Sequence, residues 1–126
     1  MRYFKAFFVT VALGVFPAVA LASATATSRQ RSGLYTAFKQ LSHGHPTPER
    51  CLTFTVSTAQ SGWANVTFSG AHPAHGCLPF AFNGATIFHF TRGHWRLVTE
   101  GSSFFSNGKC RVPHVPMKVA RDFKLC

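Results

Sequence analysis

The chain has 126 residues, of which 13 are Lys or Arg and three are Asp or Glu, so that its formal net charge is +10 at pH 7. This length suits a single small domain with one core. Three acids barely allow the carboxylate pair of a glycosidase, and the chain has no G-x-S-x-G or H-E-x-x-H motif and no glycine-rich loop before a helix.

The first two dozen residues have the pattern of a secretory signal peptide. Arg2 and Lys5 give a positive start, residues 6–22 carry no charge, and small residues in A-x-A arrangements follow. We expect residues 1–24 to be a signal peptide that is cleaved between about residues 22 and 26. A retained membrane anchor is the alternative, but the uncharged stretch contains a glycine and a proline and is shorter than the roughly 20 residues of a spanning helix.

Cleavage would make the rest of the chain a secreted, extracellular protein without a membrane span, which we expect to be a monomer. Loss of Arg2 and Lys5 with the leader lowers the net charge from +10 to +8. Such an imbalance predicts attraction to a polyanion, for example an anionic cell-envelope polymer. General solubility and non-specific adhesion are the simpler explanation, since the basic residues are scattered and no specific nucleic-acid motif is present.

Residues 25–50 are interpreted as a polar leader, an amphipathic helix and a proline-rich linker. Apolar residues recur at helical spacing at Leu34, Tyr35, Phe38 and Leu41. Ser32 is the candidate N-cap, and His43-Gly44 is the candidate stop. Pro46 and Pro48 lack a backbone donor and cannot continue the helix.

Alternating apolar and polar residues then predict a first hairpin. The apolar positions are Leu52, Phe54 and Val56 in one strand and Ala64, Val66 and Phe68 in the other. Both sets share a face if Phe54 lies opposite Val66, which requires an odd loop with a bulge at Gly62.

A second hairpin is predicted from residues 85–91 and 94–100, which flank a two-residue turn at Arg92-Gly93. This turn pairs Phe90 with Trp95, Phe88 with Leu97 and Thr86 with Thr99 on one face, which we expect to be the core face. The other face would carry the pairs His89–Arg96, Ile87–Val98 and Ala85–Glu100.

Residues 101–109 are predicted to form a loop, and Pro116 suits the first position of a short helix that ends at Cys126. Residues 51–126 would thus be a disulfide-stapled sheet domain that is one globular unit with the first helix. The predicted fold class is α+β: an N-terminal helix packed on a four-stranded antiparallel meander of two hairpins, a short C-terminal helix and two disulfides.

The four cysteines are expected to pair in an oxidising compartment. Three pairings are possible. The order of the elements favours Cys51–Cys77, because the start of the first hairpin strand lies beside the end of the second, and Cys110–Cys126, which bracket the terminal segment. A zinc site is the alternative, but no C-x-x-C pair occurs.

Short motifs are spread over residues 52–126. They are Trp63-Ala64, Cys77, Trp95-Arg96-Leu97-Val98 with Gly101-Ser102, Cys110, Val112-Pro113, and Val119 to Cys126 with Asp122. In these motifs the chain resembles a loose group of small secreted proteins from actinobacteria. The resemblance implies a bacterial exported protein of this fold class and implies no activity, and the many histidines and phenylalanines depart from the pattern.

Histidines are the candidates for reactive chemistry. His72 and His75 are weak metal candidates by spacing, but no acid lies near them to orient a ring, so we expect no metal or other cofactor. A ribonuclease-like phosphodiesterase would use His89, Arg96 and Glu100. In the predicted register Glu100 is about 13 Å from His89, across an apolar strip, so we expect no enzymatic activity.

Phe104 and Phe105 lie in a polar loop and, with Arg96, are the candidate binding residues. The simpler alternative is that the two rings fold back onto the open edge of the sheet. By elimination, the predicted function is a non-enzymatic binding or structural module at the cell surface or in the medium.

Overall fold

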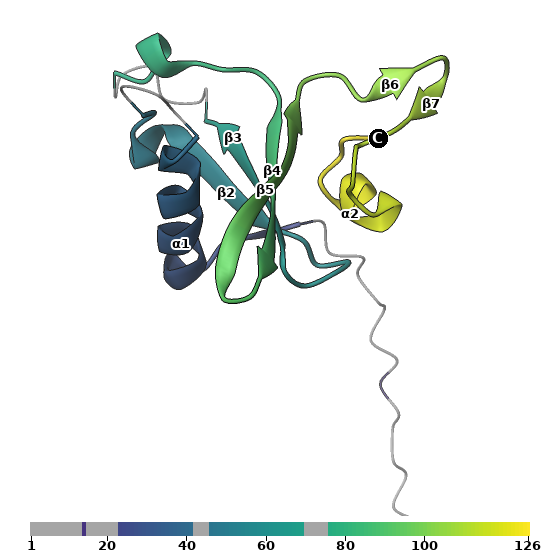
Figure 1. The fold of residues 1–126 in the computed structure, drawn as a ribbon, viewed down its shortest axis with the longest axis horizontal. Helices are drawn as coiled ribbons and strands as arrows, with labels where there is room; N and C mark the ends of the chain where they lie inside the picture. The colour runs from purple at the N-terminus through teal and green to yellow at the C-terminus, as the bar shows by residue number, and fades with distance from the viewer. Residues whose placement is uncertain (1–13, 15–22, 42–45, 70–75) are drawn as a thin grey trace, which may run out of the picture.

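The computed structural model describes residue 14 and residues 23–41, 46–69 and 76–126, and its fold is α+β (Figure 1). In chain order the elements are β1 (Ala24–Thr25), α1 (Ser28–Lys39), the 3₁₀ helix η1 (Glu49–Cys51), β2 (Leu52–Val56), β3 (Trp63–Phe68), the 3₁₀ helix η3 (Leu78–Phe80), β4 (Ala85–Thr91), β5 (His94–Gly101), β6 (Phe105–Ser106), β7 (Lys109–Cys110) and α2 (Met117–Asp122). None of the helices in the described ranges is long and apolar enough to cross a bilayer.

The main sheet has five antiparallel strands in the order β1-β2-β3-β4-β5, and β6 and β7 form a separate two-stranded sheet. The predicted meander of four strands is therefore extended at one edge by β1, where Ala24 pairs with Val56. The loop predicted for residues 101–109 contains β6. Strands β1, β6 and β7 have two residues each, which is too short to show an alternating pattern in the sequence.

The first hairpin has the predicted register, with Phe54 opposite Val66. Gly62 has a φ of 83° just before β3, a left-handed conformation that glycine adopts without steric cost. This register directs Phe54 and Val66 to the same side as α1, where both are buried.

The second hairpin has the predicted turn, but a β-bulge changes its register. Phe90 lies opposite Trp95, Phe88 opposite Leu97 and His89 opposite Arg96, as expected. Beyond the irregularity between Ile87 and Phe88, the three remaining pairs differ from the prediction: they are Ile87–Thr99, Thr86–Glu100 and Ala85–Gly101. One extra residue in β5 therefore moves Glu100 to the other face of the sheet.

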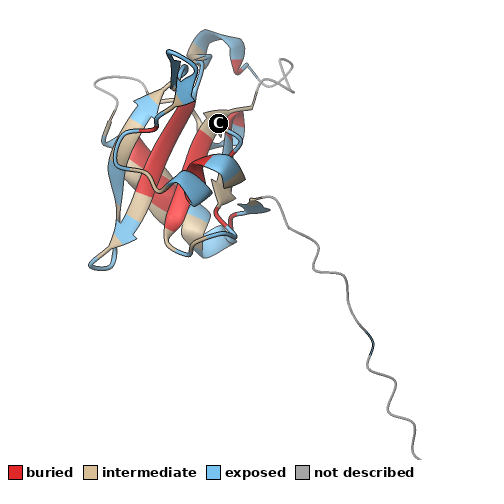
Figure 2. Ribbon diagram, turned by 90° about the vertical axis from the view of Figure 1, so that its right-hand side faces the viewer, coloured by how far each residue is buried: buried red, intermediate tan, exposed pale blue. Residues whose placement is uncertain are grey.

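The sheet buries both of its faces, which corrects the expectation of one core face. Helix α1 and helix α2 lie on opposite sides of the sheet (Figure 1), and the buried residues of the central strands lie between them (Figure 2). The core under α1 contains Leu34, Phe38, Phe54, Val66 and Phe88, with Trp95 packed against it. The core under α2 contains Trp63, Ala85, Ile87, Val119 and Phe123.

Two apolar residues of the predicted core face are in fact exposed. Phe90 has 46% of its surface exposed and Leu97 has 40%. Phe90 lies near the hairpin turn at the end of β4, and Leu97 lies on β5, the edge strand of the sheet.

Helix α1 begins earlier than predicted, because the polar residues before Leu34 have a cap of their own. Thr27 is the N-cap: its Oγ1 accepts the N–H of Gln30 at 3.2 Å, while Oε1 of Gln30 accepts the N–H of Thr27 at 2.9 Å. This reciprocal capping box satisfies two donors of the first turn, so Ser32 lies inside the helix. The predicted stop at His43-Gly44 lies outside the described residues.

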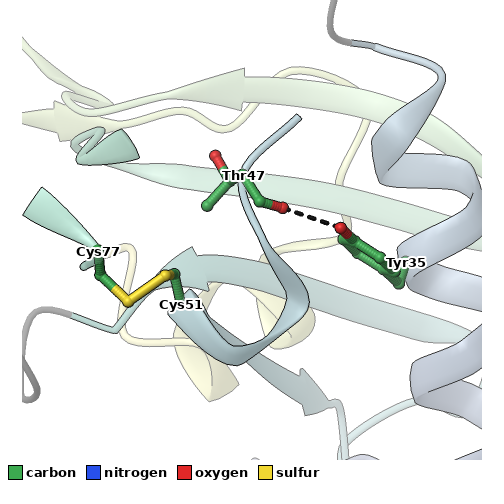
Figure 3. The surroundings of a disulfide bond; sticks show 4 residues. All are labelled: Tyr35, Thr47, Cys51 and Cys77. Atoms are coloured by element: carbon green, nitrogen blue, oxygen red, sulfur yellow. Dashed lines mark hydrogen bonds between the residues drawn. A yellow bond between two sulfur atoms is a disulfide. The ribbon is translucent and has the colours of Figure 1, made fainter. Parts of the chain in front are cut away.

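Two disulfides, Cys51–Cys77 and Cys110–Cys126, staple the chain in the pairing that the element order favours. The first lies at the start of β2, near the point where the Tyr35 hydroxyl donates to the Thr47 carbonyl at 3.1 Å (Figure 3). The second follows α2, which ends at Asp122 rather than at Cys126.

Candidate binding groove

A groove runs between α1 and the edge hairpin β4–β5, and Trp95 is at its centre. A Cβ atom at Gly33 would lie 3.1 Å from Trp95 Cδ1, so the absence of a side chain at Gly33 lets the indole ring approach the helix. Phe90 packs beside it, with ring centroids 5.1 Å apart and a tilt of 58°. The hairpin turn pairs Phe90 with Trp95, and Gly33 leaves room for the indole, so that two aromatic rings lie side by side next to α1.

Two adjoining pockets of about 540 and 440 Å³ form this α1–β5 groove, and both are within the usual range of ligand sites, about 300–1,000 Å³. They share Gly33, Thr36, His94 and Trp95. The remaining lining residues are Arg29, Gln30, Gly62, Phe90 and Gly93 on one side and Ala37, Gln40, Leu41, Phe88, Arg96 and Leu97 on the other. Because the pockets adjoin, the groove offers an elongated surface.

The lining residues of the α1–β5 groove include two arginines and no acid. Arg29 contributes from the first turn of α1 and is exposed. His94 and Arg96 are on β5, and their partners Thr91 and His89 set both side chains toward the sheet face away from α1, at the outer rim of the groove. A guanidinium donates several hydrogen bonds in one plane and suits carboxylate or phosphate groups.

The predicted binding residues divide between two places. Arg96 lines the α1–β5 groove, whereas Phe104 and Phe105 line a separate pocket with Phe123 and Lys124. Phe104 is half-buried and packs against the core under α2, while Phe105 in β6 has 61% of its surface exposed. The two rings thus have different environments, and only one of them folds back onto the protein.

The three residues considered for phosphodiester hydrolysis do not converge. His89 stacks on Trp63, with ring centroids 4.1 Å apart and an angle of 13° between the planes, and it lies opposite Arg96. Glu100 lies opposite Thr86 and lines a pocket with Phe38 of α1, so it is on the other face of the sheet. The bulge in β5 therefore separates the acid from the histidine and the arginine.

The described residues contain no group of three or more His, Cys, Asp or Glu side chains that could hold a metal ion. The weak metal candidates His72 and His75 lie outside the described residues.

The sequence did not single out Arg29, Gly33 or Gln30 as groove residues, and Trp95 was predicted to be a core residue. Arg29 and Gln30 belong to a segment that looked like a polar leader. The motif Thr27-x-x-Gln30 was the available signal that this segment is helical. The position of Gly33 against Trp95 depends on how α1 crosses the sheet, which local patterns do not encode.

Comparison of the chain with protein-family models, with curated proteins and with solved structures gave no significant match.

Proposed function

We propose that the protein is a secreted, monomeric, non-enzymatic module that binds an anionic polymer of the cell envelope along the α1–β5 groove. The observation that carries this proposal is the groove itself: it is elongated, exposes an aromatic ring, has Arg29 along it and Arg96 at its outer rim, and has no acid among its lining residues. Aromatic rings contribute apolar contact area, and arginines contribute charge-assisted hydrogen bonds.

The charge of the molecule supports the same class of ligand. Once Arg2 and Lys5 are removed with the leader, the net charge is +8. Of the three acids, Asp122 is engaged by four hydrogen bonds with Ser57, Thr58 and Ala59. A surface with so few free anions attracts polyanions over a range set by the Debye length.

Two disulfides are typical of proteins that work in an oxidising compartment, and they support a site of action outside the cytoplasm. The separation of Glu100 from His89 supports a binding role over phosphodiester hydrolysis. We expect the purified protein to leave bulk RNA intact. Hydrolysis that disappears in a His89→Ala variant would overturn the non-enzymatic role.

The test is a comparison of two charge-matched double variants. Binding to polygalacturonate, a carboxylated polysaccharide, is measured by titration calorimetry at low and at high salt, with neutral dextran as the negative control. Arg29→Gln with Arg96→Gln changes the groove. Arg111→Gln with Lys118→Gln removes the same charge from exposed positions outside it.

The groove variant is expected to lose about tenfold in affinity, the equivalent of ~1.4 kcal/mol, and the control variant much less. Binding should weaken as salt rises. Equal losses in the two variants would mean non-specific adhesion and would overturn the groove. Tighter binding of RNA than of the polysaccharide would overturn the ligand class.

A further inference from the structure

A second concave site lies on the other side of the sheet, between β3 and the C-terminal segment. It has a volume of about 300 Å³. We name it the C-terminal pocket, and its lining residues include Asn65, Ser102, Ser103, Phe105, Phe123 and Lys124. Asn65 lies opposite Ile87 of the core under α2, so the pocket is on the face away from α1.

A buried side-chain amide, that of Asn65, lines the C-terminal pocket. Asn65 has only 6% of its surface exposed. Its Oδ1 accepts the N–H of Thr86 at 3.3 Å. The nitrogen of a side-chain amide carries two donors, which a ligand in the pocket would engage.

The sides of the C-terminal pocket combine aromatic rings, hydroxyl groups and one cation. Phe105 is exposed, and Phe104 and Phe123 pack against the core behind it. Ser102 and Ser103 are exposed at the rim, and Lys124 is the single charged lining residue. No acid lines this pocket.

We infer that the C-terminal pocket binds one sugar ring that carries an anionic group. A volume of about 300 Å³ is at the small end of ligand sites and admits a ligand the size of one ring. The Asn65 amide and the serine hydroxyls match sugar hydroxyls, an aromatic ring packs on the apolar face of the sugar, and Lys124 pairs with the anion.

This inference rests on the proposed function for the ligand class, a charged saccharide, but it uses a different site. Together the α1–β5 groove and the C-terminal pocket would give one molecule two contacts on opposite faces of the sheet. A polymer held at both gains avidity, because the second contact is intramolecular once the first is made.

The test uses free monosaccharides, which are too small to span the two sites. Glucuronate is titrated into the protein and followed by NMR, with glucose and inorganic phosphate as comparison probes. Saturable shifts are expected at Ser102, Ser103, Lys124 and the side-chain amide of Asn65, with weaker binding of glucose and of phosphate. If phosphate binds as well as glucuronate, the pocket recognises only charge and the inference fails.

Matched variants locate the binding. Lys124 has a φ of 56°, so Lys124→Asn removes the charge and keeps a residue that tolerates the left-handed conformation. Lys118→Asn removes one charge from an exposed position of α2 outside the pocket. We expect Lys124→Asn and Phe105→Ala each to weaken glucuronate binding by about fivefold or more, and Lys118→Asn to leave it unchanged.

The outcome for this pocket is separable from the outcome for the groove. Glucuronate binding that survives in the Arg29→Gln, Arg96→Gln variant supports a distinct pocket. If polymer binding fails but glucuronate still binds at Lys124, the groove is wrong and the pocket stands. If glucuronate does not bind, or binds Lys124→Asn as well as the parent, the pocket is refuted whatever the polymer does.

Discussion

Asp122 ties the C-terminal helix to the turn between β2 and β3. Its Oδ2 accepts hydrogen bonds from Ser57 Oγ and Thr58 N at 2.7 Å and from Ala59 N at 3.2 Å. Burial raises the pKa of this carboxyl, but the hydrogen bonds from Ser57, Thr58 and Ala59 together lower the pKa by more than burial raises it. The pKa of Asp122 therefore lies below its ordinary value. The folded state therefore favours the ionised form of the Asp122 carboxyl, and this form stabilises the fold.

Asp122→Asn should lower the free energy of unfolding by about 1–2 kcal/mol, since hydrogen bonds to a charged group are lost at a partly exposed site. In the parent this stabilisation is complete above the unfolded pKa of 3.8 and is lost as pH falls through the lower folded value. Urea unfolding as a function of pH measures both effects. Glu100→Gln, at an exposed carboxylate, is the control. An acid-dependent loss of the same size in Asp122→Asn would contradict this role.

Gly84, just before β4, lies close against the backbone of Gly101. Its φ is 96°, and a Cβ atom there would clash with the carbonyl of Gly101. Gly93 also has a positive φ, 79°, but open space surrounds it. Gly84→Ala should therefore lose clearly more stability than Gly93→Ala, whose cost is the left-handed conformation alone, about 1–2 kcal/mol. Thermal unfolding of the two variants distinguishes them, and equal losses would show that the strand ends separate easily.

At the scale of the elements, the two disulfides differ in access. Cys51 and Cys77 are buried, with 0% and 2% of their surfaces exposed. Cys126 is exposed and Cys110 is half-buried. Because a thiolate must reach a sulfur atom to reduce the bond, we expect Cys110–Cys126 to be reduced first. Limited reduction, alkylation and mass mapping of the peptides would show it. Alkylation of Cys51 and Cys77 at the earliest times would contradict it.

Elements with strong local signals could be predicted from the sequence. The turn Arg92-Gly93 sets the pairing of Phe90 with Trp95, and alternation sets the pairing of Phe54 with Val66. The bulge in β5 could not be predicted, because Val98 and Thr99 both favour strands and no glycine marks the extra residue.

The second core was partly visible in the sequence. Strand β4 has apolar residues at successive positions, Ile87 and Phe88, and both are fully buried. A strand that is apolar on both faces is typical of a sheet that is covered on both sides. The site was less predictable, since the α1–β5 groove depends on the path of α1, and the C-terminal pocket brings Asn65 beside residues some forty to sixty positions away.

For the whole molecule, the proposed leader must end before the first strand. Ala24 pairs with Val56, and the N–H of Ala26 donates to the Phe54 carbonyl at 3.0 Å. Thr27 then caps α1. Of the three A-x-A sites, which end at Ala22, Ala24 and Ala26, only cleavage after Ala22 leaves all these contacts intact. Amino-terminal sequencing of the exported protein should therefore begin at Ser23. A start at Thr25 or Thr27 would show that β1 is dispensable.

The bulge in β5 has a consequence for how such a fold diversifies. If β5 kept all of its residues and paired without the bulge, Val98 would lie opposite Ile87 and Glu100 opposite Ala85, on the side that His89 and Arg96 occupy. An acid, a histidine and an arginine would then share one face of the sheet, and Val98 would stay on the α2 side beside Ile87. In a fold of this kind, the gain or loss of one bulge therefore changes which polar side chains share a surface, without any exchange of side chains.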